Sequence, residues 1–201
     1  VRGIRTTLEE GWMIFISMAS VSLYTAGNAF ILGLLTNNLA VGYYSAAEQI
    51  VRAMQGLLGP ISQATYPRFS RMALESSDLA LLWGQRMLLF MVGLGFILST
   101  ALFAGAPIIV RIVLGSEYEP SIAVMQILAG LCFLIAASNV LGIQIMIPFG
   151  KDKAFASIIF SAGILNIIFA FLLAPIWQEK GMALAVLLSE AFVAGAMLFY
   201  L

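Results

Sequence analysis

The chain has 201 residues, of which 62% are hydrophobic and 10% are charged, and its ten Lys and Arg residues balance its ten Asp and Glu residues. Globular domains carry roughly 25% charged residues, and a soluble core cannot hide this much apolar surface, so we predict an integral membrane protein. A net charge of zero gives no basic surface for a nucleic-acid partner, and the absence of His with a single Cys excludes imidazole chemistry and a cysteine zinc site.

The sequence contains no pairing of a carboxylate with a nucleophile and no glycine-rich phosphate loop. We therefore expect that the protein is not an enzyme and uses no cofactor or metal. The chain starts at Val1, is charged at once and stops at Leu201 within an apolar run, so we expect a fragment of a longer protein and not a signal peptide. Residues 1–201 are expected to form one domain.

The predicted fold class is all-α, a polytopic transmembrane bundle of six spans, because a spanning helix needs about 20 mostly apolar residues. Pro67 is expected to end the second span, since a proline disfavours the helical conformation in the residue before it. Residues 68–86 should form a polar connection with a short interfacial helix at 79–83. Gly93 and Gly95 predict close contact with a neighbouring helix. The six spans are 11–35, 39–66, 87–109, 121–149, 154–177 and 182–201.

Six spans would place both ends of the chain on one side of the membrane. Seven of the ten Lys and Arg residues fall on that side and two on the other, while Arg52 lies within a span. The excess of positive charge predicts that the N-terminus and the 68–86 connection are cytoplasmic.

The second span carries a polar face. At about 100° per residue, seven residues fall within about 60° of Glu48, and large apolar residues lie opposite. Lipid cannot solvate such a face, so it should contact protein or water. Glu48 and Arg52 are four residues apart and can form an ion pair. The residues near Glu48 are Ser45, Arg52, Gln55, Gly59, Ser62, Gln63 and Tyr66.

Two interpretations of this ion pair are open. It could be a structural pair that holds two helices together, or it could form the charged wall of a water-filled cavity. The further polar residues on the same face favour the cavity. In that case Arg52 would attract an anion such as a phosphate, because a guanidinium offers a planar fork of donors, and Glu48 would orient Arg52 or titrate.

Other polar residues lie within the predicted spans. Glu190 is either a structural acid or a coupling-ion site, and single amides bridge helices more often than they bind ligands. Tyr43, Tyr44 and Trp177 fit an interfacial aromatic belt. The single amides are Asn28, Asn139, Gln144 and Asn166. The candidate substrate-binding residues are Arg52, Glu48, Gln55 and Asn28, and the candidate ion-coupling residues are Glu48 and Glu190.

Several short motifs are distributed along the chain: Gly42–Arg52, Tyr66–Arg71, Phe149–Lys153, Asn166, Leu172–Pro175, Gly181–Ala183 and Ser189–Glu190. These motifs resemble those of the polysaccharide exporters often called Wzx or O-antigen flippases. The resemblance extends over nearly the whole chain and departs from the family at 177–180, where the family usually has a shorter turn.

The resemblance implies a fold and a function. Such exporters resemble multidrug exporters of the MOP superfamily, with about twelve to fourteen helices in two six-helix lobes around a central cavity, and this chain would be mostly the second, C-terminal lobe of a MATE-like transporter. The implied activity is the transfer of undecaprenyl-pyrophosphate-linked oligosaccharide repeat units across the bacterial inner membrane by alternating access. The implied partners are this lipid-linked substrate, membrane lipids and a glycan polymerase.

Alternatives remain within and outside this class. A lipid II flippase or a drug or cation antiporter belongs to the same superfamily, although a cation exporter favours an acidic cavity and Arg52 is basic. A membrane scaffold or a glycan polymerase is an alternative of a different class. A polymerase should carry large polar external loops, and those predicted here are short.

Overall fold

The computed structural model describes residues 27–75 and 77–201. Within these residues the chain is helical and contains no strand, which confirms the all-α prediction. A helix over 27–35 precedes α2, and short π- and 3-10-helical segments connect the longer helices. The long helices are α2 (Asn38–Gln55), α3 (Gly59–Glu75), α4 (Ser77–Ile109), α5 (Ser121–Asn139) and α6 (Asp152–Tyr200). The short segments are η1 (Val110–Leu114), η2 (Ser116–Tyr118) and η3 (Val140–Met146).

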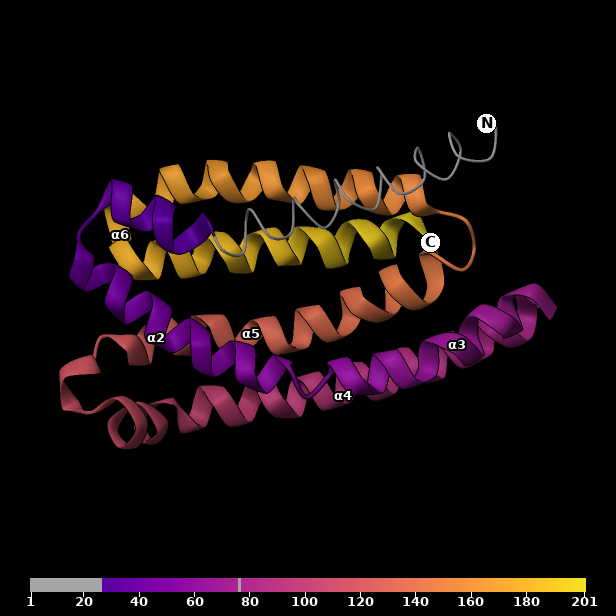
Figure 1. Ribbon diagram of the computed structural model, residues 1–201, viewed down its shortest axis with the longest axis horizontal. Coiled ribbons are helices and arrows are strands. Elements are labelled where there is room, and N and C mark those ends of the chain that lie inside the picture. Colours follow the sequence, from indigo (N-terminus) through magenta and orange to yellow (C-terminus); the bar gives the residue numbers. More distant parts are fainter. Residues whose placement is uncertain (1–26, 76) are drawn as a thin grey trace, which may run out of the picture.

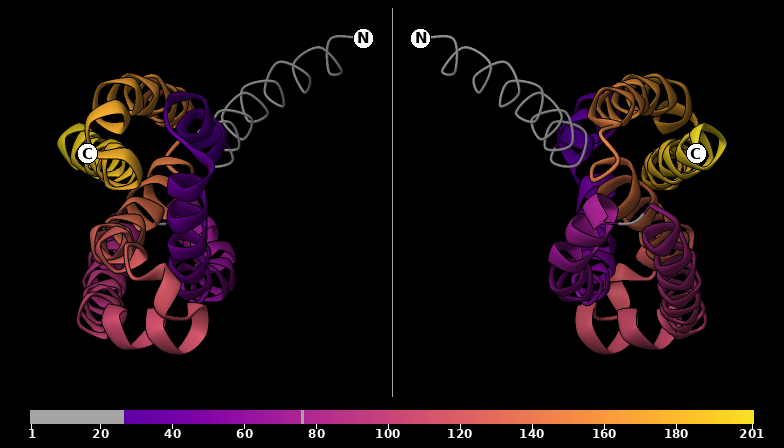
Figure 2. Two further views of the ribbon diagram at one scale, coloured as in Figure 1. Left: turned by 90° about the vertical axis from the view of Figure 1, so that its left-hand side faces the viewer. Right: turned by 90° about the vertical axis from the view of Figure 1, so that its right-hand side faces the viewer.

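The helices lie along one long axis, with α5 between the others (Figures 1 and 2). The most extensive helix contacts are those of α5 with α4, α6 and α2. Helix α5 accordingly has buried residues on several faces, among them Val124, Met125, Leu128 and Cys132. In contrast, α4 exposes large apolar side chains along its length, as expected for a helix whose outer face contacts lipid.

Among residues 27–75 and 77–201, three helical stretches are long and apolar enough to cross a membrane: Leu81–Leu114, Ser121–Met146 and Asp152–Tyr200. The last is long enough for two spans, and Gln178 interrupts it with non-helical dihedral angles (φ 50°, ψ −125°). Figure 1 shows α6 folding back there, so its two arms correspond to the predicted fifth and sixth spans. Gly181 permits this close turn, because a Cβ there would clash with the backbone of Leu173. The predicted first span lies mostly outside the described residues.

The predicted second span, 39–66, is wrong as a single helix. Helix α2 ends at Gln55 and α3 begins at Gly59, with a turn over 56–58. Pro60 has no N–H to donate to the Gly56 carbonyl. Gly56, within the turn, and Gly59, directly after it, lower the helix propensity there. The polar face predicted from Ser45 to Tyr66 assumed an unbroken helix. Its residues on α2 and its residues on α3 therefore need not point in the same direction.

The predicted end at Pro67 and the predicted connection over 68–86 are also wrong. Helix α3 contains Pro67 and continues to Glu75, and α4 begins at Ser77, so residues 79–83 belong to α4. Pro67 cannot donate to the Gln63 carbonyl, but both residues are exposed, and an exposed carbonyl can bond to solvent instead. The described polar residues of this region therefore lie in helices and not in a loop.

Helices α4 and α5 approach closely at Gly95. A Cβ at Gly95 would lie 2.7 Å from both the Ala136 Cβ and the Cys132 carbonyl oxygen, so only glycine fits without a shift of the helices. This confirms the predicted close contact for Gly95. Gly93 has open space around it, so the same prediction was wrong there.

Candidate functional site

Helix α2 is fixed at its N-terminal end. The Asn37 side chain accepts a hydrogen bond from the Ala40 N–H at 2.9 Å and so caps the helix. The Ser121 hydroxyl of α5 donates to the Tyr43 carbonyl at 2.9 Å. Tyr44 and Val51 are among the buried residues of α2. These contacts hold α2 against α5 and set the direction of its polar side chains.

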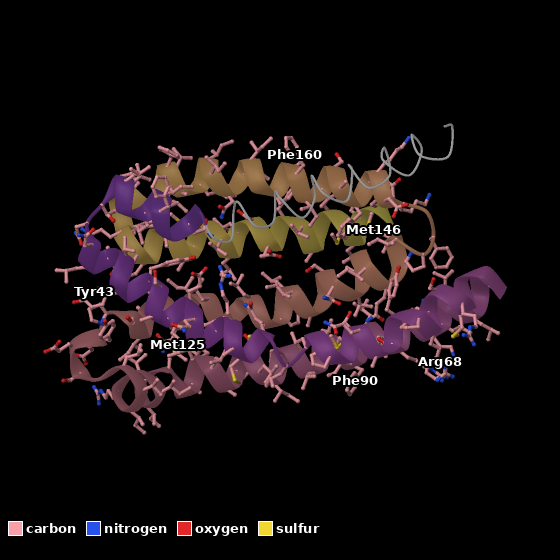
Figure 3. The ribbon with its side chains drawn as sticks, viewed as in Figure 1. Tyr43, Arg68, Phe90, Met125, Met146 and Phe160 are labelled. Carbon is pink, nitrogen blue, oxygen red and sulfur yellow. The ribbon has the colours of Figure 1, made fainter. Side chains whose placement is uncertain are left out.

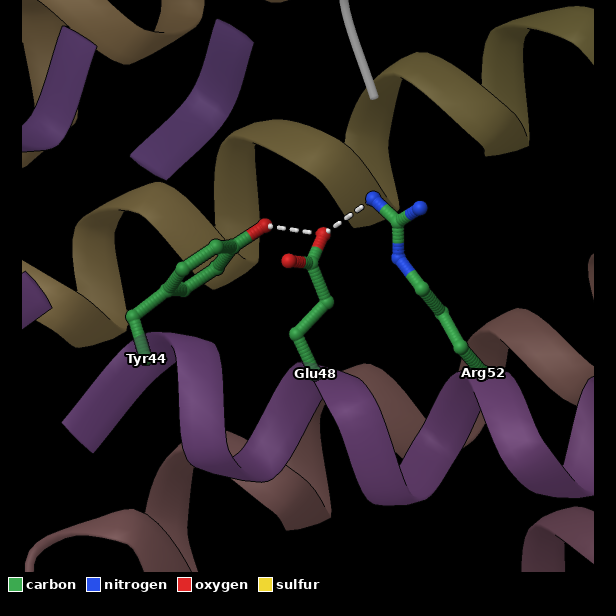
Figure 4. A network of polar contacts seen from close by, with 3 residues as sticks. All are labelled: Tyr44, Glu48 and Arg52. Atoms are coloured by element: carbon green, nitrogen blue, oxygen red, sulfur yellow. Dashed lines mark hydrogen bonds and ion pairs between the residues drawn. The ribbon is translucent and has the colours of Figure 1, made fainter. Parts of the chain in front are cut away.

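Three side chains of α2 form a connected polar group (Figure 4). The Arg52 Nη2 lies 2.9 Å from the Glu48 Oε1, and the Tyr44 hydroxyl donates to the same oxygen at 3.1 Å. The Arg52 side chain is 47% exposed and that of Glu48 is 17% exposed. A guanidinium has five N–H donors, and nearly half of the Arg52 side chain is exposed.

The same side chains line a cavity of about 100 Å³. This volume has room for several water molecules, so Arg52 is not enclosed in dry packing. The cavity is bounded by the helix over 27–35 and by α2, α5 and the second arm of α6. Its polar lining is Asn28, Glu48, Arg52, Gln55 and Glu190, and its apolar lining is Val51, Leu128, Leu131, Ile135 and Val186.

The structure thus brings together all five residues that the sequence suggested for substrate binding or ion coupling. Glu190 is 7% exposed and reaches the cavity from a helix about 140 positions away in the chain. Polar groups from three elements face an apolar wall from α5. The role of each residue in binding or coupling remains a prediction.

The polar residues of α3 lie elsewhere, in a hydrogen-bonded cluster with α5 and η3. The Ser62 hydroxyl donates to the Asn139 Oδ1 at 2.5 Å, and the Gln144 Nε2 contacts the Ser62 and Thr65 hydroxyls at 3.2 and 3.1 Å. Asn139 and Gln144 therefore bridge helices, as predicted for single amides. None of these four residues lines the cavity of Glu48 and Arg52.

The other two amides form no such bridge through their buried atoms. Within the described part of the chain, the Asn28 Oδ1 and both polar side-chain atoms of Asn166 have no hydrogen-bond partner. Asn166 is fully buried on the first arm of α6. A buried amide without a partner is costly, so Asn166 is not explained by helix bridging among the described residues, whereas the Asn28 side chain still has a hydrogen bond with Tyr44 of α2.

Tyr44 was missed as a site residue. The interfacial-belt prediction for Tyr44 is wrong, because its side chain is fully buried and bonds to Glu48. A sequence signal did exist, since Tyr44 lies one helical turn before Glu48 on the same face. The apolar wall from α5 had no such signal, because every residue of a hydrophobic helix fits an apolar pattern equally well.

Comparisons with known proteins agree with the resemblance that the sequence motifs indicated. A family model described as "Polysaccharide biosynthesis protein" matches residues 1–73. The chain is 36% identical over 200 residues to an Escherichia coli (strain K12) protein named "Putative O-antigen transporter", covering 100% of this chain and 48% of that protein. It is 31% identical over 199 residues to a Shigella dysenteriae protein of the same name, covering 98% of this chain and 49% of that protein.

The chain spans about half the length of these curated relatives. No solved structure matches it at a significant level. The resemblance to the Wzx or O-antigen exporters that the sequence motifs indicated is confirmed by the family match and by both relatives.

Proposed function

We propose that this chain, a membrane protein that resembles the polysaccharide exporters along nearly its whole length, forms one lobe of a flippase for lipid-linked saccharides. The substrate would be an undecaprenyl-pyrophosphate-linked oligosaccharide repeat unit, moved from the cytoplasmic to the outer leaflet of the bacterial inner membrane. The names of the two relatives support transport of O-antigen. The cavity beside α2, which Arg52 lines, supports a binding site for the charged group of this substrate.

The observation that carries the proposal is the half-exposed guanidinium of Arg52 in a cavity with room for water or a small ion. Its planar fork can bind two oxygens of a phosphate. Glu48 holds the guanidinium in position from one side, and the Tyr44 hydroxyl in turn fixes Glu48. This preorganisation lowers the entropy that binding must overcome.

The size of the cavity limits what it can hold. Small-molecule sites usually have volumes of roughly 300–1,000 Å³, and this cavity has about 100 Å³. It therefore suits a phosphate or an ion and not a whole saccharide unit. We infer that the sugars and the polyprenyl chain lie outside it, between this lobe and the rest of the transporter and in the lipid.

Alternating access fits this arrangement. In transporters built from two lobes, the lobes rock about a site near the membrane midplane. A site on one lobe binds the anionic group while the opening changes sides. Differential affinity of the two states for substrate would drive the cycle, and Glu48 or Glu190 would couple it to an ion.

One observation favours a second candidate, the drug or cation antiporter of the same superfamily. Glu48 and Glu190 line the same cavity as Arg52, so two acids accompany one base there. Acidic groups within a membrane protein often bind protons or cations. A lipid II flippase fits a site that binds an anion through Arg52 as well as the O-antigen exporter does. No observation favours a scaffold or a polymerase.

Arg52→Ala provides the test in a strain that depends on this protein for surface saccharide. We expect surface display to fall at least tenfold, because the variant loses the donors that bind phosphate, while the amount of protein in the membrane stays normal. Surface saccharide is measured by antibody labelling and protein by immunoblot. Arg111→Ala is the matched control, since Arg111 is exposed and pairs with Glu119 away from the cavity. Full display with Arg52→Ala would remove the cavity from the mechanism.

A further inference from the structure

A second cavity lies between α3 and α4, away from the one beside α2. It has a volume of about 290 Å³, and its lining includes the apolar side chains of Phe69, Met87 and Phe90 and the cations of Arg68 and Arg86. Figure 3 shows Arg68 and Phe90 on the same side of the α3–α4 pair. None of these residues lines the cavity of Arg52, so the proposed substrate site does not account for this one.

Both arginines are arranged around Trp83. The Cζ atom of Arg68 lies 4.5 Å from the centre of the Trp83 ring, and that of Arg86 lies 6.0 Å from it. A guanidinium that stacks on an aromatic ring uses its flat face, so its in-plane N–H donors stay available. The Trp83 ring therefore holds the guanidinium groups of Arg68 and Arg86 near each other and leaves their N–H donors available for hydrogen bonds.

The described side chains supply no anion to this pair of like charges. Among them, neither Arg68 nor Arg86 forms an ion pair, and no carboxylate is found in the described lining of this cavity. Two neighbouring cations repel each other. A bound anion with several oxygens would relieve this repulsion and accept hydrogen bonds from both guanidiniums.

The surroundings identify the kind of anion. The apolar membrane-crossing stretch of α4 begins at Leu81, two residues before Trp83, and Trp side chains favour the boundary between lipid and water. A phosphate at this boundary sits beside an apolar cavity. A free phosphate would make no use of that cavity, whereas a phospholipid carries a phosphate and an apolar chain together.

We propose that Arg68, Arg86 and Trp83 bind the phosphate headgroup of an anionic phospholipid, with an acyl chain in the apolar cavity between α3 and α4. The predicted orientation of the chain places this site at the cytoplasmic leaflet, where anionic lipids attract basic residues. This site is independent of the proposed transport function. It would set the depth and tilt of the α3–α4 pair in the membrane.

The test uses the fluorescence of Trp83 in a Trp12→Phe/Trp177→Phe background, in vesicles of phosphatidylcholine that contain brominated phosphatidylglycerol or brominated phosphatidylcholine. Bromine quenches a tryptophan that it touches. We expect phosphatidylglycerol to be preferred about fivefold or more at Trp83, on the scale of one basic residue near an anionic leaflet. Arg68→Gln/Arg86→Gln should remove the preference, and Arg71→Gln, an exposed cation on α3 that does not line the cavity, should leave it unchanged.

Three results would overturn the proposal. They are equal quenching by the two lipids in the parent protein, an unchanged preference in Arg68→Gln/Arg86→Gln, and loss of the preference when excess inorganic phosphate is added, which would indicate a site for free anions. Native mass spectrometry of the chain with its natural tryptophans gives a second measurement. The parent chain should retain more phosphatidylglycerol than Arg68→Gln/Arg86→Gln does. Equal retention by the two proteins would also contradict the proposal.

Discussion

Two polar regions follow one another along the chain but differ in kind. On α2, Glu48 and Arg52 form a charged pair beside a cavity of about 100 Å³. On α3, Ser62 and Thr65 form neutral hydrogen bonds to Gln144, whose side chain is fully buried. The first region leaves a half-exposed guanidinium beside open space, whereas the second uses its polar groups to join helices. Polarity within a membrane helix therefore indicates a ligand site only where hydrogen-bonding capacity and open space remain.

This difference predicts opposite outcomes for activity and stability. A change in the α2 region should reduce transport and leave folding nearly intact. A change in the α3 cluster should weaken folding and leave the transport rate of each folded molecule nearly intact.

The largest expected effect comes from Glu48→Gln. The variant keeps the size of the side chain but removes the charge that orients Arg52, so we expect transport to fall about tenfold or more, by analogy with the loss of one positioning hydrogen bond to a charged group. Stability should change by less than about 1 kcal/mol, because a partly exposed ion pair contributes little. Surface saccharide display and thermal unfolding in detergent measure the two quantities.

Gln49→Leu is the matched control for Glu48→Gln, since Gln49 is the exposed neighbour on α2 and does not line the cavity. Normal transport by Glu48→Gln, together with a loss of stability above about 2 kcal/mol, would mean that the pair is a structural one. The contrast between the two regions would then disappear.

A smaller effect is expected from Gln144→Leu. This change removes the hydrogen bonds to the Ser62 and Thr65 hydroxyls, and hydrogen bonds between membrane helices contribute about 0.6–1.7 kcal/mol each. Because two such bonds are lost, we expect the free energy of unfolding in micelles to fall by about 1–3 kcal/mol. Transport per folded molecule should stay within about twofold, equivalent to less than 0.5 kcal/mol in the barrier.

A double-mutant cycle with Ser62→Ala sharpens this prediction. If Gln144 and Ser62 act through their mutual bond, the two losses of stability will be less than additive. Additive losses, or a tenfold loss of transport per folded molecule, would show that the cluster is not a purely structural joint.

The smallest expected effect is geometric. In the variant Gly59→Ala/Pro60→Ala, the residues that interrupt the helix are replaced by a strong helix former. We expect spin labels at the exposed positions 49 and 63 to move by a few ångströms toward about 21 Å, the separation of fourteen residues in a continuous helix at 1.5 Å each. Pulsed electron paramagnetic resonance measures this distance.

An unchanged distance in this variant would mean that packing against α5 imposes the turn over 56–58. Gly42→Ala is the control, because Gly42 lies within α2 and has open space around it. Its label distance should stay at the parent value.

The sequence predicted the helical class and much of the cavity for physical reasons that remain valid. Charged residues within apolar stretches are costly, which is why Glu48, Arg52 and Glu190 could be recognised singly. Their meeting in one cavity could not be predicted, because it depends on how α6 folds back and packs. The separation of α2 from α3 was missed because the apolar pattern continues through Gly56 and Pro60 without a change.

The opposite error occurred at Pro67. The rule that proline disfavours a helix predicted an end there, but α3 continues through Pro67 in the folded chain. A proline within a helix is tolerated when the carbonyl it leaves unbonded is exposed, and Gln63 is exposed. Exposure is a property of the folded chain, so no local pattern distinguishes Pro60 at the start of a helix from Pro67 within one. The functional roles of the cavity residues likewise depend on chemistry that geometry alone does not specify.

The contact at Gly95 restricts which helices can move against one another. With the α4 backbone in direct contact with Cys132 and Ala136 of α5, sliding of one helix along the other would force the next side chain into this contact. The two helices are therefore expected to translate and rotate as a rigid unit. Movement within the described chain is then expected mainly at α2 and α6, the two elements that carry Glu48 and Glu190 beside Arg52.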